Sequence, residues 1–257
     1  MRTIESINKE KVGDFLRIVA KTDIGLMRTS NEDSYAAGEL PGSVAWAVVC
    51  DGMGGAAGGN IASSTAVKLI SERISSGYHK GMSSNSIRNV LTSAITAANY
   101  SVFDAGQQNP ELQGMGTTVV ATILVDGVAC IAHVGDSRAY LLSEGKLRQL
   151  TKDHSFVQEM VDNGRLTEAE AKDDPRKNII TRALGVAEEL RIDFCEEFLD
   201  DSDVLLICTD GLTNFVTETE ICEITSEAKY YEYAEKLVNR ANKNGGGDNI
   251  TVVTLSY

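Results

Sequence analysis

Acidic residues directly follow several apolar segments of the chain. Asp51, Asp136 and Asp210 each come after a run of six or seven mostly apolar residues, and Asp248 stands between three glycines and the last apolar segment. Such runs are typical of buried strands. An unpaired carboxylate at the end of a buried strand is costly to desolvate. Glycines beside Asp51, Asp210 and Asp248 also let the backbone approach a ligand closely.

Carboxylates brought together in this way predict a site for hard divalent cations. One Asp-Gly after a strand is ordinary turn chemistry, so the argument rests on the repetition. Manganese and magnesium prefer octahedral oxygen sites that keep water, and three or four converging aspartates could bind two such ions. Zinc is the weaker choice, because no cluster of histidines or cysteines lies nearby. A further acidic cluster is Asn31-Glu32-Asp33.

Other chemistries at the same residues fit less well. Residues 52–57 satisfy the G-x-G-x-x-[GA] pattern of a dinucleotide site, but Asp51 would lie beside the pyrophosphate and Glu72 falls in a helical pattern. No G-x-x-x-x-G-K-[ST] motif occurs. Phosphatases with an aspartate nucleophile need an aspartate where Cys208 stands. No covalent nucleophile is therefore apparent.

Composition narrows the class of protein. The chain has 257 residues, 42% hydrophobic and 24% charged, with a formal net charge of −13. This is soluble-globular usage. The acidity argues against a nucleic-acid partner. The first 15 residues lack the apolar core of a signal peptide, and no apolar run reaches the ~20 residues of a membrane span.

The five cysteines form no C-x-x-C pair, which favours reduced thiols and a cytoplasmic location. The three histidines, His79, His133 and His154, are scattered, and we interpret them as structural.

Short turns between apolar runs predict antiparallel pairing. Residues 117–150 hold turn signals at Asp126-Gly127, Gly135-Asp136 and Glu144-Gly145, too short for parallel crossovers. The periodicity predicts further strands at 15–20, 44–50, 190–198, 203–208 and 250–257, and helices at 60–74, 84–104, 154–173, 217–226 and 229–242. A polar loop is expected at 75–86. These elements favour an α+β fold.

Eight segments, in order, resemble the motifs of the type 2C (PPM) metal-dependent protein phosphatases in their compact bacterial form. They are TDIGLMRTSNED (22–33), VVCDGMGG (48–55), GMGTT (114–118), AHVGDSRAY (132–140), LTKDH (150–154), ITRALG (180–185), LICTDGL (206–212) and GGGDNITVV (245–253). The resemblance implies one catalytic domain, 1–257. Its fold would be a central antiparallel β-sandwich flanked by helices on both faces, in four α-β-β-α layers, with a flap at about 155–182 near the active site.

The resemblance also implies a role for individual residues. Asp51 would bridge two Mn²⁺ or Mg²⁺ ions, with the Gly52 carbonyl on one of them, and Asp210 and Asp248 would hold the other. Asp136, with Asp210, would form a third site.

Other matching positions would support these ligands. Arg28 would bind the substrate phosphate, for which a guanidinium fork is well suited. Glu32 and Asp33 would act through bound water, and Asn249 and Thr118 would support the ligands.

The implied activity is hydrolysis of phosphoserine and phosphothreonine in proteins, by in-line attack of a hydroxide that bridges the two metals. Such enzymes often oppose a bacterial Ser/Thr kinase, and we expect a monomer. Met53 departs from the many relatives that have a histidine there, thought to protonate the leaving group. The acid could instead be a metal-bound water, or the step could be slower.

Two other functions compete with this one: a phosphatase dedicated to one stress-signalling antagonist, and a catalytically inactive phosphate-sensing scaffold. Intact Asp51, Asp210, Asp248 and Arg28 argue against the scaffold. Flap cations (Arg165, Lys172, Arg176, Lys177 and Arg182) form either a solvated surface or a means of selecting substrates.

Overall fold

Two antiparallel sheets stacked face to face form the centre of the molecule. The computed structural model describes residues 16–257. One sheet has the order β1-β11-β10-β7-β8 and the other β2-β3-β5-β6-β9, with the short β4 paired to β3. Every strand pair is antiparallel. The strands of the first sheet are β1 (Arg17–Asp23), β11 (Ile250–Ser256), β10 (Val204–Cys208), β7 (Arg138–Ser143) and β8 (Lys146–Gln149). Those of the second are β2 (Asp33–Leu40), β3 (Val44–Met53), β5 (Val119–Val125), β6 (Val128–Val134) and β9 (Asp193–Phe198), beside β4 (Gly116–Thr117).

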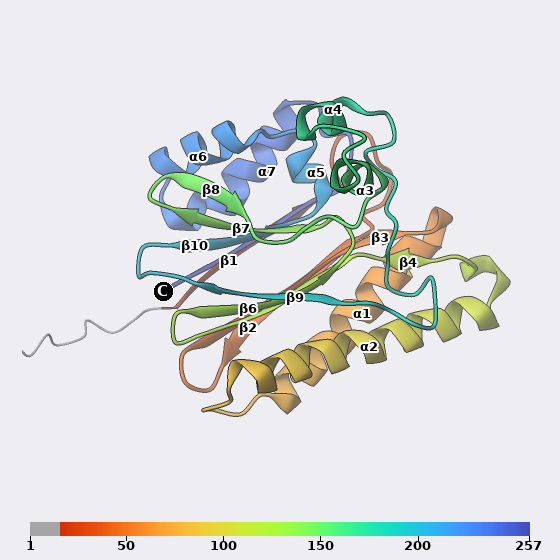
Figure 1. The fold of residues 1–257 in the computed structure, drawn as a ribbon, viewed down its shortest axis with the longest axis horizontal. Helices are drawn as coiled ribbons and strands as arrows, with labels where there is room; N and C mark the ends of the chain where they lie inside the picture. Colours follow the sequence, from red (N-terminus) through yellow and green to blue (C-terminus); the bar gives the residue numbers. More distant parts are fainter. Residues whose placement is uncertain (1–15) are drawn as a thin grey trace, which may run out of the picture.

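Helices cover the outer face of each sheet (Figure 1). The long helices α1 (Gly55–Gly77) and α2 (Ser84–Gln108) lie on the β2–β9 sheet, and α5 (Asp210–Thr213), α6 (Glu218–Glu227) and α7 (Tyr233–Lys243) lie on the other. The predicted four-layer α-β-β-α architecture is confirmed.

The side chains of strand β3 pack into two apolar layers, one on each face of its sheet. Side chains alternate across a strand. Trp46, Val48 and Cys50 therefore face α1 and α2, whereas Ala47 and Val49 face the opposing sheet. A third apolar cluster fills the space between the β1–β8 sheet and α6 and α7. A strand buried on both faces has no polar alternation, as in the continuous run VAWAVVC.

Several predicted boundaries differ from the observed ones. The strand expected at 15–20 is β1, which runs to Asp23, and residue 15 lies outside the described part. Helix α1 begins at Gly55, five residues earlier than predicted, and strand β2 was not predicted. The segment 229–242 begins with a short 3₁₀ turn (Tyr230–Glu232) before α7.

The flap segment is two short helices instead of the single one predicted for 154–173. They are α3 (Phe156–Asp162) and α4 (Glu168–Asp173). Gly164, with φ 66, makes the turn between them, in a conformation that a side chain would disfavour. A capping box of Thr167 and Glu170 starts α4.

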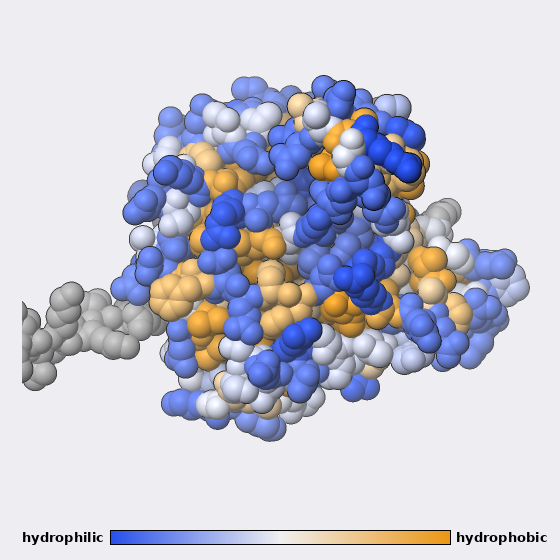
Figure 2. Space-filling view, viewed as in Figure 1, coloured by the Kyte–Doolittle hydropathy of each residue, from blue (hydrophilic) through white to orange (hydrophobic). Residues whose placement is uncertain are grey.

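The surface in Figure 2 is mostly hydrophilic over α3 and α4, with apolar residues between the edges of the two sheets. Among the helices that the structure describes, none is long and apolar enough to cross a membrane.

Candidate metal and phosphate site

A cavity of about 500 Å³ opens where the predicted acidic residues meet. Its wall comes from the β1–β2 loop, the end of β3, the loop before β7, the flap, the start of α5 and the turn before β11. The lining residues are Arg28, Thr29, Ser30, Glu32, Asp51, Gly52, Met53, Gly54, Thr118, Asp136, Asn178, Ile180, Asp210, Asp248 and Asn249. The structure thus brings together nearly all of the residues singled out from the sequence, and Asp33 lies buried among them.

The end of β3 holds Asp51 in place through its backbone. The Asp51 N–H donates to Thr118 Oγ1 (2.9 Å), and its carbonyl accepts from the Thr118 N–H (2.8 Å). Gly52 next to it leaves no room for a side chain, because a Cβ would overlap the Gly59 carbonyl and lie 2.7 Å from the Glu32 carbonyl oxygen. The backbone here is therefore fixed, and only glycine fits.

Asp210 and Asp248 reach the cavity from the opposite sheet. Asp210 is the first residue of α5, and its Oδ2 accepts from Asn214 Nδ2 (2.9 Å). Asp248 precedes β11 and accepts a 2.8 Å hydrogen bond from the Arg28 guanidinium. This pairing raises the pKa of Arg28 and holds its charge at the cavity.

Asn249 fixes the loop that carries Arg28. Its side-chain Nδ2 donates to the carbonyls of Ile24 (2.9 Å) and Ser30 (3.0 Å), and its Oδ1 accepts from the Glu32 N–H (2.8 Å). Asn249 therefore ties the segment 24–32 to the turn before β11. Burial raises the pKa of nearby Glu32.

Asp33 joins the two sheets beneath the cavity. Its Oδ2 accepts hydrogen bonds from Thr251 of β11 (2.7 Å) and from Thr209, which directly follows β10 of the same sheet (2.9 Å). Its Oδ1 is buried without a hydrogen-bond partner among the described residues. Burial raises the pKa of Asp33 to about 7, even though the two threonines oppose the shift.

The cavity concentrates negative charge out of water. Burial first, and then the charges of Asp33 and Asp210, raise the pKa of Asp51 well above its usual range. Burial and Asp210 raise the pKa of Asp136 to about 8, and burial and Asp248 raise that of Asp210. Carboxylates crowded in this way are stabilised in their charged form by a bound cation.

These residues fit hard divalent cations. The acidic side chains around the cavity offer carboxylate oxygens, which such ions prefer as ligands. Asp33 Oδ1, which has no hydrogen-bond partner among the described residues, can also accept from a water bound to an ion. Within residues 16–257, no three acidic, histidine or cysteine side chains converge tightly enough to form a metal cage by themselves. Magnesium-type ions retain several waters and need few protein ligands, so the spacing is compatible with them.

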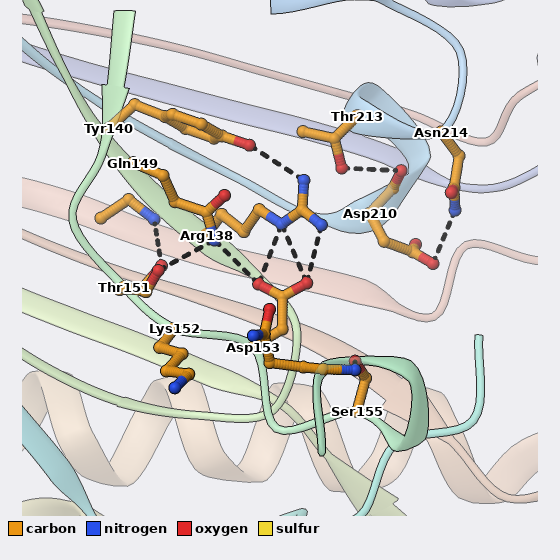
Figure 3. A network of polar contacts seen from close by, with 12 residues as sticks. Arg138, Tyr140, Gln149, Thr151, Lys152, Asp153, Ser155, Asp210, Thr213 and Asn214 are labelled. Atoms are coloured by element: carbon orange, nitrogen blue, oxygen red, sulfur yellow. Dashed lines mark hydrogen bonds and ion pairs between the residues drawn. The ribbon is translucent and has the colours of Figure 1, made fainter. Parts of the chain in front are cut away.

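An ion pair that the sequence analysis gave no role lies beside Asp210 (Figure 3). Arg138, the first residue of β7, donates from Nε (2.9 and 3.1 Å) and Nη2 (2.7 Å) to the carboxylate of Asp153. Its Nη1 donates to the Tyr140 hydroxyl (3.0 Å). The Arg138 charge lowers the pKa values of Asp136 and Asp210, and so opposes the effect of burial. Both residues lie in motifs that the sequence analysis quoted, but their pairing depends on a contact between distant segments.

The flap contributes Asn178 and Ile180 to the cavity wall, and neither was predicted. Two of the flap cations are already paired: Arg176 with Asp174 (2.7 Å) and Arg182 with Asp193 (3.0 Å). The Arg176 guanidinium also stacks on Phe156.

The histidines and cysteines lie apart from this chemistry. His133 and His154 are buried and stacked on each other with ring centroids 4.8 Å apart. None of the three histidines lines the cavity. All five cysteines are free of disulfides, as the sequence predicted.

A helix-flanked antiparallel sandwich with aspartates and an arginine around one cavity is the arrangement that the motifs led us to expect of a metal-dependent phosphatase. The family model described as protein phosphatase 2C matches residues 28–252, and the chain belongs to that family. The family, fold and enzyme class predicted from the motifs are confirmed.

Similar proteins are named as serine/threonine phosphatases. The serine/threonine phosphatase stp of Listeria monocytogenes is 41% identical over 91% of this chain and 93% of its own length. The S. agalactiae serine/threonine phosphatase has a similar structure (TM-score 0.88, 35% identity, 94% of this chain and 99% of the other). The catalytic domain of PstP, solved in complex with two manganese ions, also matches (TM-score 0.81, 34% identity, 94% and 97% coverage).

Proposed function

We propose that this protein hydrolyses phosphoserine and phosphothreonine in proteins with two divalent cations, manganese or magnesium, held by the cavity aspartates. The observation that carries the proposal is the convergence of Asp51, Asp210 and the buried Asp136 in one cavity with Asp248 and Arg28. The two manganese ions bound by the PstP catalytic domain support the choice of metal.

Each residue has a distinct part in this proposal. Asp51 and the Gly52 carbonyl hold both ions together with Asp210 and Asp248, and Asp136 with Asp210 provides a third position. Glu32 and Asp33 act through bound water. Two divalent ions supply charge neutralisation and an activated water for in-line attack on phosphorus.

Arg28 binds the phosphate oxygens, and Asp248 and Asn249 keep its loop in place. Met53 lines the cavity but cannot donate a proton to the leaving alkoxide.

The same proposal covers the setting of the enzyme. We propose one catalytic domain over residues 1–257, which the family match over 28–252 supports. Its substrates are phosphoproteins, including a Ser/Thr kinase and its targets, and it acts as a cytoplasmic monomer in signalling. The five unpaired cysteines support a reducing compartment.

The test is hydrolysis of an aryl phosphate and a phosphothreonine peptide, with manganese, with a chelator, and by Asp51→Asn. We expect turnover that requires metal and falls by at least about 10²-fold in Asp51→Asn. Asp162→Asn, an exposed aspartate on α3, is the matched control and should retain activity. Metal-independent turnover, or full activity in Asp51→Asn, would refute the proposal. No turnover of either substrate would favour the inactive scaffold.

A further inference from the structure

Exposed apolar side chains are concentrated around the cavity. Nine large apolar residues are exposed within the described part of the chain, and five of them lie on two segments that line the cavity. Residues 24–30, the loop rim, carry Ile24, Leu26 and Met27. Residues 178–186, the flap rim, carry Ile179 and Val186. Single exposed apolar residues are common on any surface, whereas a group bordering a site indicates binding.

The loop rim is held rigidly beside the phosphate site. Leu26 and Met27 are 66% and 74% exposed and directly precede Arg28. The Leu26 N–H donates to the Gly246 carbonyl (2.7 Å), and Asn249 binds the carbonyls of Ile24 and Ser30. Because the backbone is anchored at both ends, the two side chains remain in solvent beside Arg28.

The flap rim is anchored in the same way. The Ile179 carbonyl accepts from the Phe156 N–H (2.8 Å), and the buried Asn99 binds Gly185 N–H (2.7 Å) and the Ala187 carbonyl (2.9 Å). Ile179 and Val186 are each 51% exposed between these anchors. Val186 and the cavity residue Met53 both lie 2.9 Å from the place where a Cβ on Gly116 would stand, so their apolar surface continues into the cavity.

At the flap rim, charged side chains offer a ligand less than apolar side chains do. Arg182, the one cation among residues 178–186, is paired with Asp193, and Arg176 just before the rim is paired with Asp174. Half of the exposed side chains along the two rims are aliphatic or Met side chains, and burying them against a ligand is favourable in proportion to the apolar area removed from water.

We infer that the two rims bind an extended segment of the substrate in which bulky apolar side chains flank the phosphorylated residue. This inference rests on the proposed phosphatase function and names the substrate class of that same site. The phosphate enters the cavity beside Arg28, and the flanking side chains cover Leu26 and Met27 on the loop rim and Ile179 and Val186 on the flap rim.

The experiment compares two phosphothreonine peptides of equal length and charge, one with Leu and Val on both sides of the phosphothreonine and one with Ser and Gly there. Each kcat/KM is divided by that for an aryl phosphate, so that changes in chemistry cancel. We expect the apolar peptide to be favoured about tenfold by the unmodified protein, equivalent to about 1.4 kcal/mol. The double variant Leu26→Ser/Met27→Ser, and separately Ile179→Ser, should reduce this preference to about threefold or less.

Phe198→Ser is the matched control, because Phe198 is 62% exposed on β9 and does not line the cavity. It should retain the tenfold preference. Equal kcat/KM for the two peptides, an unchanged preference in both rim variants, or a comparable loss in Phe198→Ser would each overturn the inference while leaving the phosphatase function intact. Absence of metal-dependent aryl phosphate hydrolysis would instead refute the function on which the inference rests.

Discussion

The Arg138–Asp153 ion pair allows a quantitative test of how much burial increases the contribution of an ion pair to the free energy of unfolding. In Asp153→Asn the side chain keeps its shape, but the charge is lost and one oxygen facing the guanidinium becomes an amide. Asp153 is only 10% exposed and Arg138 30%, and three hydrogen bonds of 2.7 to 3.1 Å join them. Removing one partner of a buried pair typically destabilises by about 3–5 kcal/mol, because a charge is left uncompensated.

Since Arg138 keeps some contact with water, we expect about 3 kcal/mol. At about 2–4 °C per kcal/mol for a protein of this size, the thermal midpoint should fall by about 6–12 °C. Differential scanning calorimetry of the metal-free protein measures this directly.

The matched control is Asp162→Asn, which breaks an ion pair of similar length (2.6 Å to Lys152) between side chains that are 42% and 60% exposed. Exposed pairs contribute about 0–1 kcal/mol, so its midpoint should change by no more than about 4 °C. If the two variants lose the same stability, the reasoning from burial is wrong.

Two further predictions concern the cavity and the flap rim. In chelator, the thermal midpoint should fall as pH rises from 6.5 to 8.5, because the folded protein holds protons on Asp33 (pKa about 7) and Asp136 (pKa about 8) that the unfolded chain has already released. Asp136→Asn should flatten this slope and manganese should abolish it; a midpoint that rises with pH in chelator would contradict the assignment. Asn99→Ala should destabilise by about 2 kcal/mol in urea unfolding, since it leaves the buried Gly185 N–H without a partner, whereas exposed Asn89→Ala on the same helix should change little.

The sequence predicted Asp51, Asp136 and Asp210 because each follows a strand with a strong apolar pattern, and Asp248 because it stands between three glycines and the last such strand. Strand β2 was missed because DSYAAGEL holds few residues that favour strands. It forms because its whole length pairs with residues 44–51 of β3, which sets Asp33 opposite Asp51. Pairing with β3 therefore outweighs the low strand preference of these residues. No spacing of residues in the sequence indicates that pairing.

The missed site residues have a similar explanation. Arg138 and Asp153 meet only because the chain returns past β7 after β8, and Asn178 reaches the cavity only because the flap folds back over it. Such contacts between distant segments are set by topology. The break between α3 and α4 did have a local signal, the Asn163-Gly164 pair, which is typical of a turn.

The cross-sheet hydrogen bonds of Asp33 have a consequence for the order of events during synthesis. Thr251, which donates to Asp33, comes 218 residues later in the chain, and Asp248 precedes it by only three. The strand that carries Thr251 also lies between β1 and β10. A nascent chain therefore cannot assemble its acidic cavity until residues 248–251 have left the ribosome. A chain interrupted before these residues would lack both Asp248 and the Thr251 hydrogen bond that holds Asp33.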